Sequence, residues 1–261
     1  MWERAMPYEY TVQDIATEAV EVEKLLALDI DAIAECAVND PTERQRSASS
    51  LLRSSMDQGR AIACLLAQDP REFGGVVGAL HRIHIEHFVR GAYFGLVAND
   101  REVQKFTQSG DLPQVAADTR IRNQCRHCTP KKRATRNMHF KEMLAAVDRL
   151  MHQKQSRLVE VVGKKWGDLN DFAHGGKLVL EIYQQDEHGI GAYVSLRALG
   201  GLLASTTVLS MNTCAYWCLI ARIPTDQALA LVRASSDRIA QYIAQRSSRY
   251  PDPAVQQIAA I

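Results

Sequence analysis

Three charged residues recur at intervals of four within an apolar stretch, residues 76–97, that contains no proline. They are Arg82, Glu86 and Arg90, and a helix would place them along one stripe. Apolar side chains flank the stripe, which is typical of a buried helix, and buried charges must be paired. Two interpretations follow. Either the stripe binds an anionic group, with Glu86 orienting a guanidinium, or it is an internal ion-pair ladder that fixes the helix register.

A second polar group comprises Asn170, Asp171 and His174, which one helical turn would bring onto a common face. A carboxylate beside an imidazole orients the ring and raises its basicity, and general acid–base catalysis uses this effect. The glycines that follow, Gly175 and Gly176, would let a ligand approach the backbone closely. The structural alternative is a helix end capped by Asn170 and stopped by Gly175, with His174 bonded to a nearby carbonyl.

Metal chemistry has weaker candidates. Cys125 and Cys128 have the two-residue gap of a zinc knuckle, but no second pair has that spacing, so inert thiols are the alternative. His81, His84 and His87 recur every three residues and therefore drift around a helix. They are more typical of a polar flank on a buried helix than of a metal pair. We expect no cofactor, because the chain has no phosphate-binding glycine-rich loop.

A basic segment lies between Asp118 and Glu142, where no other acidic residue occurs. Each cation there could contact a phosphate of RNA and add salt-dependent affinity, although no aromatic residue before Phe140 is present to stack on bases. The alternative is a solvated loop. The candidate RNA-binding residues are Arg120, Arg122, Arg126, Lys131, Lys132, Arg133 and Arg136.

The elements that would position these groups are helices, because apolar residues recur with helical spacing and proline, asparagine or aspartate punctuates the intervals. We predict no sheet, although residues 179–186 could be extended. Residues 198–221 carry no charge, but hydroxyl and amide side chains interrupt them, which favours a central buried helix over a membrane span. The predicted helices are residues 10–38, 41–68, 70–98, 99–108, 140–162, 190–223 and 225–246.

The sequence therefore predicts an all-α fold, a single helical bundle of about six or seven helices over residues 1–250. The helices at 70–98 and 190–223 would form its centre. Residues 110–139 would be an exposed basic excursion and residues 251–261 a loose tail. A hydrophobic content of 46% and a net charge of +1 are typical of a soluble protein without a global field for nucleic acid. Six cysteines without a secretory signal indicate reduced thiols and a cytoplasmic location.

The polar residues also carry a resemblance. Arg82, Glu86 and Arg90-Gly91, followed by an aromatic run, Asn99-Asp100 and a helix with Phe106, resemble the bacterial family of uncharacterised proteins DUF6988. The resemblance covers about residues 45–245. Members share a later element that is represented here by Trp166, Leu169, Asn170, Asp171, Phe172, His174 and Gly176.

That family is distantly similar to HEPN-like all-α domains, many of which are metal-independent ribonucleases of toxin–antitoxin and phage-defence systems and usually homodimers. The HEPN-like signature is an arginine followed by a polar residue and, a few positions on, a histidine. His174 is preceded by Lys164-Lys165 instead, so Arg82 or Arg90 would supply the cation from another helix.

The resemblance implies an endoribonuclease in which His174 is the general base on a ribose 2′-hydroxyl. Arg82 and Arg90 would stabilise charge on phosphate, and Asp171 and Glu86 would orient the catalytic groups. Asn170 is a further candidate residue of this catalytic site. The implied partners are RNA, an antitoxin or other protein, and a second copy of the chain, with no membrane. The sequence leaves open whether the protein is an enzyme. The alternative is a non-catalytic helical module that binds a protein partner or a small anionic ligand.

Overall fold

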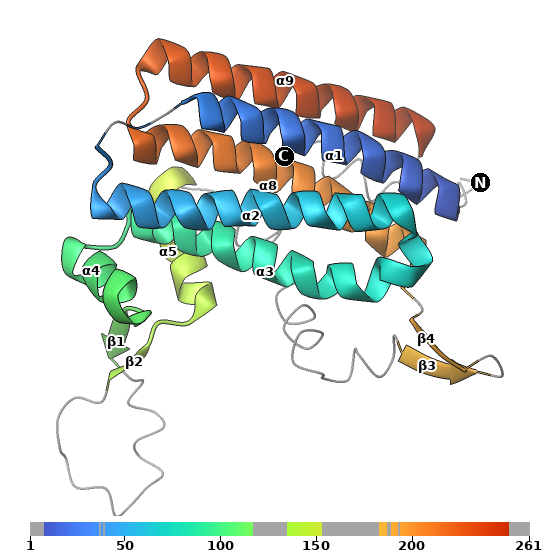
Figure 1. Ribbon diagram of the computed structural model, residues 1–261, viewed down its shortest axis with the longest axis horizontal. Helices are drawn as coiled ribbons and strands as arrows, with labels where there is room; N and C mark the ends of the chain where they lie inside the picture. Colours follow the sequence, from blue (N-terminus) through green and yellow to red (C-terminus); the bar gives the residue numbers. More distant parts are fainter. Residues whose placement is uncertain are drawn as a thin grey trace, which may run out of the picture.

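The computed structural model describes residues 8–36, 38, 40–116, 135–152, 183–186, 189–192 and 194–250. Within these ranges it is an all-α bundle of seven helices with two short hairpins (Figure 1). The helices are α1 (Val12–Glu35), α2 (Glu43–Gln68), α3 (Pro70–Leu96), α4 (Asp100–Ser109), α5 (Phe140–His152), α8 (Leu196–Ala221) and α9 (Thr225–Arg249). The strands are β1 (Gln114–Ala116), β2 (Thr135–Asn137), β3 (Tyr183–Asp186) and β4 (Gly189–Ala192).

Local sequence signals set most of the helix starts. Thr11, Thr42 and Asn99 each form a capping box with the residue three positions on, so two backbone donors are satisfied at each end. Asp69 caps α3, and Pro70 stands at its first position, where the missing N–H costs nothing. The predicted start of a helix at residue 70 is confirmed, and the helix predicted from residue 99 begins at Asp100 with Asn99 as its cap.

The prediction of no sheet is wrong, because the described residues include two antiparallel hairpins of two strands each. Strand β1 pairs antiparallel with β2, so the described ends of the 110–139 excursion lie side by side. Strand β3 pairs antiparallel with β4, with Tyr183 opposite Ala192. The prediction of one helix over residues 190–223 is therefore wrong at its start, because residues 189–192 form a strand and α8 begins at Leu196. The prediction of an extended segment is confirmed for residues 183–186.

The core is divided along the bundle. One cluster, which includes Phe88, Phe94 and Tyr216, joins α2, α3, α5 and α8. A second cluster, which includes Leu26 and Leu203, joins α1 to α2, α3 and α8. Helix α8 contributes to both and, as predicted, is largely buried. None of the described helices is long and apolar enough to span a membrane.

Close approach of α3 to its neighbours depends on glycine. A methyl group at Gly91 would lie 2.9 Å from the side chain of Leu52 on α2, and one at Gly95 would overlap Ile220 on α8. Any larger residue would push α3 away from both helices, since interiors are close-packed. These glycines therefore help to fix the position of the helix that carries the Arg82–Glu86–Arg90 stripe.

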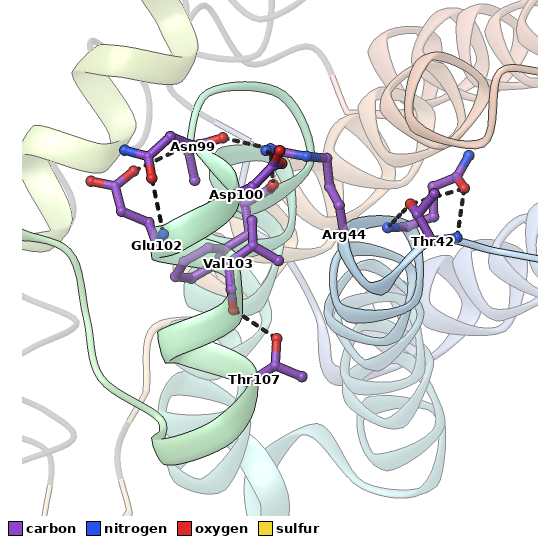
Figure 2. Close-up of polar contacts among 10 residues, drawn as sticks. Thr42, Arg44, Asn99, Asp100, Glu102, Val103 and Thr107 are labelled. Carbon is purple, nitrogen blue, oxygen red and sulfur yellow. Dashed lines mark hydrogen bonds and ion pairs between the residues drawn. The ribbon is translucent and has the colours of Figure 1, made fainter.

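Arg44 of α2 donates hydrogen bonds to backbone carbonyls at the C-terminal end of α3 and in the turn that follows (Figure 2). The Arg44 guanidinium donates through Nη1 to the carbonyl oxygens of Phe94 (2.9 Å) and Ala98 (2.5 Å). Its Nη2 pairs with Asp100 Oδ1 at 2.6 Å. The last carbonyls of a helix have no partner within the helix, so Arg44 satisfies that of Phe94, and its bond to Ala98, which lies after the helix end, ties α2 to the α3–α4 turn.

Two ionic contacts, each to a buried carboxylate, hold α9 against α1. Arg246 Nε donates to Glu18 Oε1 at 2.5 Å, and the Tyr242 hydroxyl donates to the same oxygen. Nearer the other end of α1, Asp29 accepts from Ser210 (2.8 Å), Ser235 (2.9 Å) and Arg238 (2.5 Å). The charges inside this part of the bundle are thus paired and hydrogen-bonded, as buried charges must be.

Candidate anion-binding site

The Arg82–Glu86–Arg90 stripe forms the predicted ladder on α3. Glu86 pairs through Oε2 with Arg82 Nη2 at 3.7 Å and through Oε1 with Arg90 Nη2. The side chains are 18%, 19% and 29% exposed, so the stripe is half-buried and not fully enclosed as its apolar surroundings predicted. Helix α3 borders one side of the bundle in Figure 1, with α2 beside it. Partial exposure leaves the ladder within reach of a ligand.

The imidazole of His87, which was not among the predicted catalytic residues, lies beside the ladder. His87 is half-buried, and its Nδ1 is 3.0 Å from the Ser54 hydroxyl of α2. Partial burial and the charge of Arg90 lower the pKa of His87, while Glu86 opposes them. The ring is therefore neutral at pH 7, and because Nδ1 is engaged with Ser54, Nε2 is the nitrogen that can exchange a proton with a ligand.

The spacing along the chain could have identified His87. It lies five residues after Arg82, the order of arginine and then histidine that the HEPN-like signature requires, although the residue after Arg82 is the apolar Ile83. From the sequence alone, the three histidines of α3 are predicted to form one polar flank. Their different burial separates them.

The other two histidines of this helix belong to the core. His84 Nδ1 donates to the Ser55 carbonyl oxygen (2.7 Å), and complete burial lowers the pKa of His84 to about 4. His81 is buried and lies 3.5 Å from the Thr206 hydroxyl. Both imidazoles pack in the core on the predicted polar flank, and neither lies on the ladder. Among the residues with a described position, no group of three metal-ligating side chains is found.

One of the predicted basic residues has a described position. Arg136 on β2 binds Glu142 of α5 with two parallel bonds, of 2.6 and 2.7 Å. The pair lowers the pKa of Glu142 to about 2, with the Arg136 bonds as the largest cause. This bidentate contact ties the base of the β1–β2 hairpin to α5 and occupies the guanidinium fork.

The remaining predicted site residues lie outside the described residues. These are Asn170, Asp171 and His174 of the predicted catalytic turn, Cys125 and Cys128 of the weak metal candidate, and Arg120, Arg122, Arg126, Lys131, Lys132 and Arg133 of the basic segment. The described part of the predicted site is therefore the ladder, with His87 and Ser54 as additions.

Comparison of the chain with models of protein families, with curated proteins and with solved structures finds no match. The resemblance to DUF6988 and to HEPN-like domains stays a prediction.

Proposed function

We propose that the protein binds RNA phosphates at the Arg82–Glu86–Arg90 ladder and cleaves RNA without a metal ion, as a HEPN-like ribonuclease of the toxin or defence type. The observation that supports this proposal is that Arg90 is held by Glu86 yet remains nearly a third exposed, with His87 on the adjacent face of the same helix. An oriented guanidinium beside a neutral imidazole suits phosphate chemistry.

In the proposed reaction, a neutral imidazole removes the proton of a ribose 2′-hydroxyl. The 2′-oxygen then attacks the adjacent phosphorus, and the 5′-oxygen of the next nucleotide leaves with a proton from a general acid. Arg90 and Arg82 stabilise the negative charge that builds on the phosphoryl oxygens. Two histidines compete for the role of base: His174, which the resemblance implies, and His87, which adjoins the ladder.

The test incubates the purified protein with RNA in a chelator and measures the cleavage rate. We expect Arg90→Lys to slow cleavage about 10²-fold, since lysine keeps the charge and loses the planar fork. Arg53→Lys is the matched control, because Arg53 also forms an i, i+4 pair with a carboxylate, Asp57, on the neighbouring helix α2. His87→Asn and His174→Ala then identify the base, as the variant that abolishes cleavage while folding normally.

The second candidate is the non-catalytic helical module. The observation that favours it is that Glu86 pairs with an arginine on each side, so the ladder needs no ligand to balance its carboxylate. On this proposal Arg90→Lys lowers the stability of the fold. The wild-type protein then shows no cleavage of RNA in the presence of a chelator. Binding of inorganic phosphate, measured by calorimetry, would then separate an anion-binding module from a purely structural ladder.

A further inference from the structure

Two serine–histidine pairs join α2 to α3, one in the core and one at the surface. In the core pair, the Ser55 hydroxyl donates to the His84 carbonyl oxygen at 2.8 Å, so its proton is already used. His84 Nδ1 lies 2.7 Å from the Ser55 carbonyl oxygen, which can only accept a hydrogen bond. His84 therefore carries its proton on Nδ1, and its Nε2 is buried without a partner among the described residues.

The surface pair has a different arrangement of donors. The hydroxyls of Ser47 and Thr107 donate to the carbonyl oxygen one turn back in their own helices, at 2.9 and 2.7 Å, as helical hydroxyls commonly do. Within the described part of the chain, Ser54 makes no such bond, and its hydroxyl contacts only His87 Nδ1, at 3.0 Å. The Ser54 proton is therefore available for His87, and Nδ1 is its acceptor.

The Ser54 contact decides which nitrogen of His87 holds the ring proton. A hydroxyl that donates to Nδ1 leaves the proton of the neutral imidazole on Nε2, opposite to the arrangement in His84. Partial burial, and then the charge of Arg90, lower the pKa of His87, so the ring is neutral at pH 7. His87 thus presents an N–H donor at Nε2, where a general base would have to present a lone pair.

The ligand that suits this donor follows from its neighbours on α3. His87 and Arg90 are three residues apart, so they are adjacent on the helix surface. Both carboxylate oxygens of Glu86 are paired with arginines, and Arg90 remains 29% exposed. An anion with several oxygen acceptors can accept from the imidazole and the guanidinium together, and a phosphate group has this chemistry.

We propose that Ser54 is a positioning residue that fixes His87 as a hydrogen-bond donor, so that His87 Nε2–H and the Arg90 guanidinium bind the same phosphate group. In the proposed ribonuclease, His87 then stabilises charge on a phosphoryl oxygen, and a different group removes the 2′-hydroxyl proton. The choice of RNA as ligand rests on the proposed function. The tautomer of His87 and the binding of inorganic phosphate do not.

The first test is long-range ¹H–¹⁵N NMR of the full-length protein, with ¹⁵N-labelled histidine at pH 7, which identifies the protonated ring nitrogen. We expect the proton on Nε2 in His87 and on Nδ1 in His84, which is the reference in the same spectrum. Ser54→Ala should increase the fraction of the Nδ1–H form of His87, and Ser54→Thr, which keeps a hydroxyl, should retain the wild-type form. Ser47→Ala is the matched control on α2 and should change nothing at His87.

The second test titrates the same proteins with inorganic phosphate by calorimetry at constant ionic strength. Ser54→Ala should weaken phosphate binding about fivefold, the effect of one misdirected hydrogen bond, and Ser54→Thr should restore it. His87→Gln provides an amide N–H in place of Nε2–H and cannot act as a base. It should therefore bind phosphate and slow RNA cleavage by less than about tenfold, whereas loss of a general base costs about 10²–10⁴-fold.

The wild-type spectrum alone can overturn the proposal, if it shows the His87 proton on Nδ1. Equal His87 tautomers in Ser54→Ala and Ser47→Ala, no phosphate binding by the wild type, or a loss of cleavage of 10²-fold or more in His87→Gln would also overturn it. Phosphate binding and the expected tautomer in a wild-type protein that cleaves no RNA would support this proposal and remove the ribonuclease proposal alone.

Discussion

Two of the arginine–carboxylate groups in the described part of the chain have the same chemistry in different surroundings. Arg246 and Glu18 are 2% and 1% exposed, and Tyr242 and Tyr10 supply further hydrogen bonds to them. Arg82, Glu86 and Arg90 lie along one helix and are half-buried. The first group joins α9 to α1, whereas the second joins residues of a single helix. Burial and the number of elements joined, and not residue type, distinguish a structural ion pair from a candidate binding site.

The largest expected effect comes from the buried pair. Arg246→Ala leaves Glu18 as an unpaired charge in the core, which costs about 3–5 kcal/mol of the free energy of unfolding. Urea denaturation measures this loss. Arg249→Ala is the matched control, because Arg249 pairs with Glu21 on the same two helices but in an exposed position, where pairs contribute about 0–1 kcal/mol. Equal losses in the two variants would contradict the difference in stabilisation between the buried and the exposed ion pair.

The second effect concerns the pH dependence of stability, which should differ between two histidines of α3, the buried His84 and the half-buried His87. The pKa of His84 in the folded protein is about 4, below its ordinary value of 6.5, so the unfolded chain binds a proton first as pH falls. The contribution of neutral His84 to stability is complete above pH 6.5 and is lost as pH falls to 4, a change of about 3 kcal/mol.

Denaturation of the wild type and of His84→Gln from pH 7 to pH 4 checks this prediction, and the variant should show the flatter profile. His87, which is only half-buried, should alter the stability profile far less. If His87 is the base, replacing it should change the pH dependence of RNA cleavage instead. A stability profile that His84→Gln leaves unchanged would contradict the assignment of His84 to the core.

A third prediction compares two arginines of similar exposure. Arg44 is 26% exposed and Arg90 29%, but Arg44 binds the carbonyl oxygens of Phe94 in the last turn of α3 and of Ala98 in the turn after it. Arg44→Ala should therefore cost about 1–2 kcal/mol, since it leaves helix-terminal acceptors without their charged donor. The denaturation midpoint in urea measures the loss. An effect no larger than that of Arg90→Ala would show that exposure alone governs stability.

The smallest effect on stability is expected at the ladder itself. Arg90→Ala removes one i, i+4 pair on a half-buried helix face and should cost about 1 kcal/mol or less. Arg53→Ala on α2, with its pair to Asp57, is the control of equal spacing. A loss of several kcal/mol at Arg90 would assign the ladder to the structural class of the Glu18–Arg246 pair and would weaken the ribonuclease proposal.

The sequence allowed much of the helical segmentation to be predicted because its signals are local. The capping residue Asn99, the proline at position 70 and the uncharged interior of α8 each act within one or two helical turns. The boundary of α8 was missed because residues 189–192 continue its apolar pattern, and their pairing with residues 183–186 gives that stretch a different backbone. A short apolar run does not distinguish a strand from a helix.

The candidate site was likewise predicted only in part: contacts within one helix were predicted, and a contact between helices was missed. The four-residue spacing of Arg82, Glu86 and Arg90 was sufficient to predict their ion pairs, since both partners lie on one helix. The contact of His87 with Ser54 was missed because it joins residues on different helices. The equal spacing of His81, His84 and His87 gives no reason to distinguish them in the sequence. Packing against α2 and α8 buries His81 and His84 and leaves His87 half-exposed.

The sequence by itself determined where most helices begin and end and which charges lie one turn apart, because those properties depend on neighbours along the chain. Tertiary structure alone decided that Glu18 meets Arg246, 228 positions away, and that His87 lies half-buried against Ser54 of α2. The physical reason is that the free energy of a charge depends on the water excluded from it and on the donors brought to it. Both are set by the helices that pack around it.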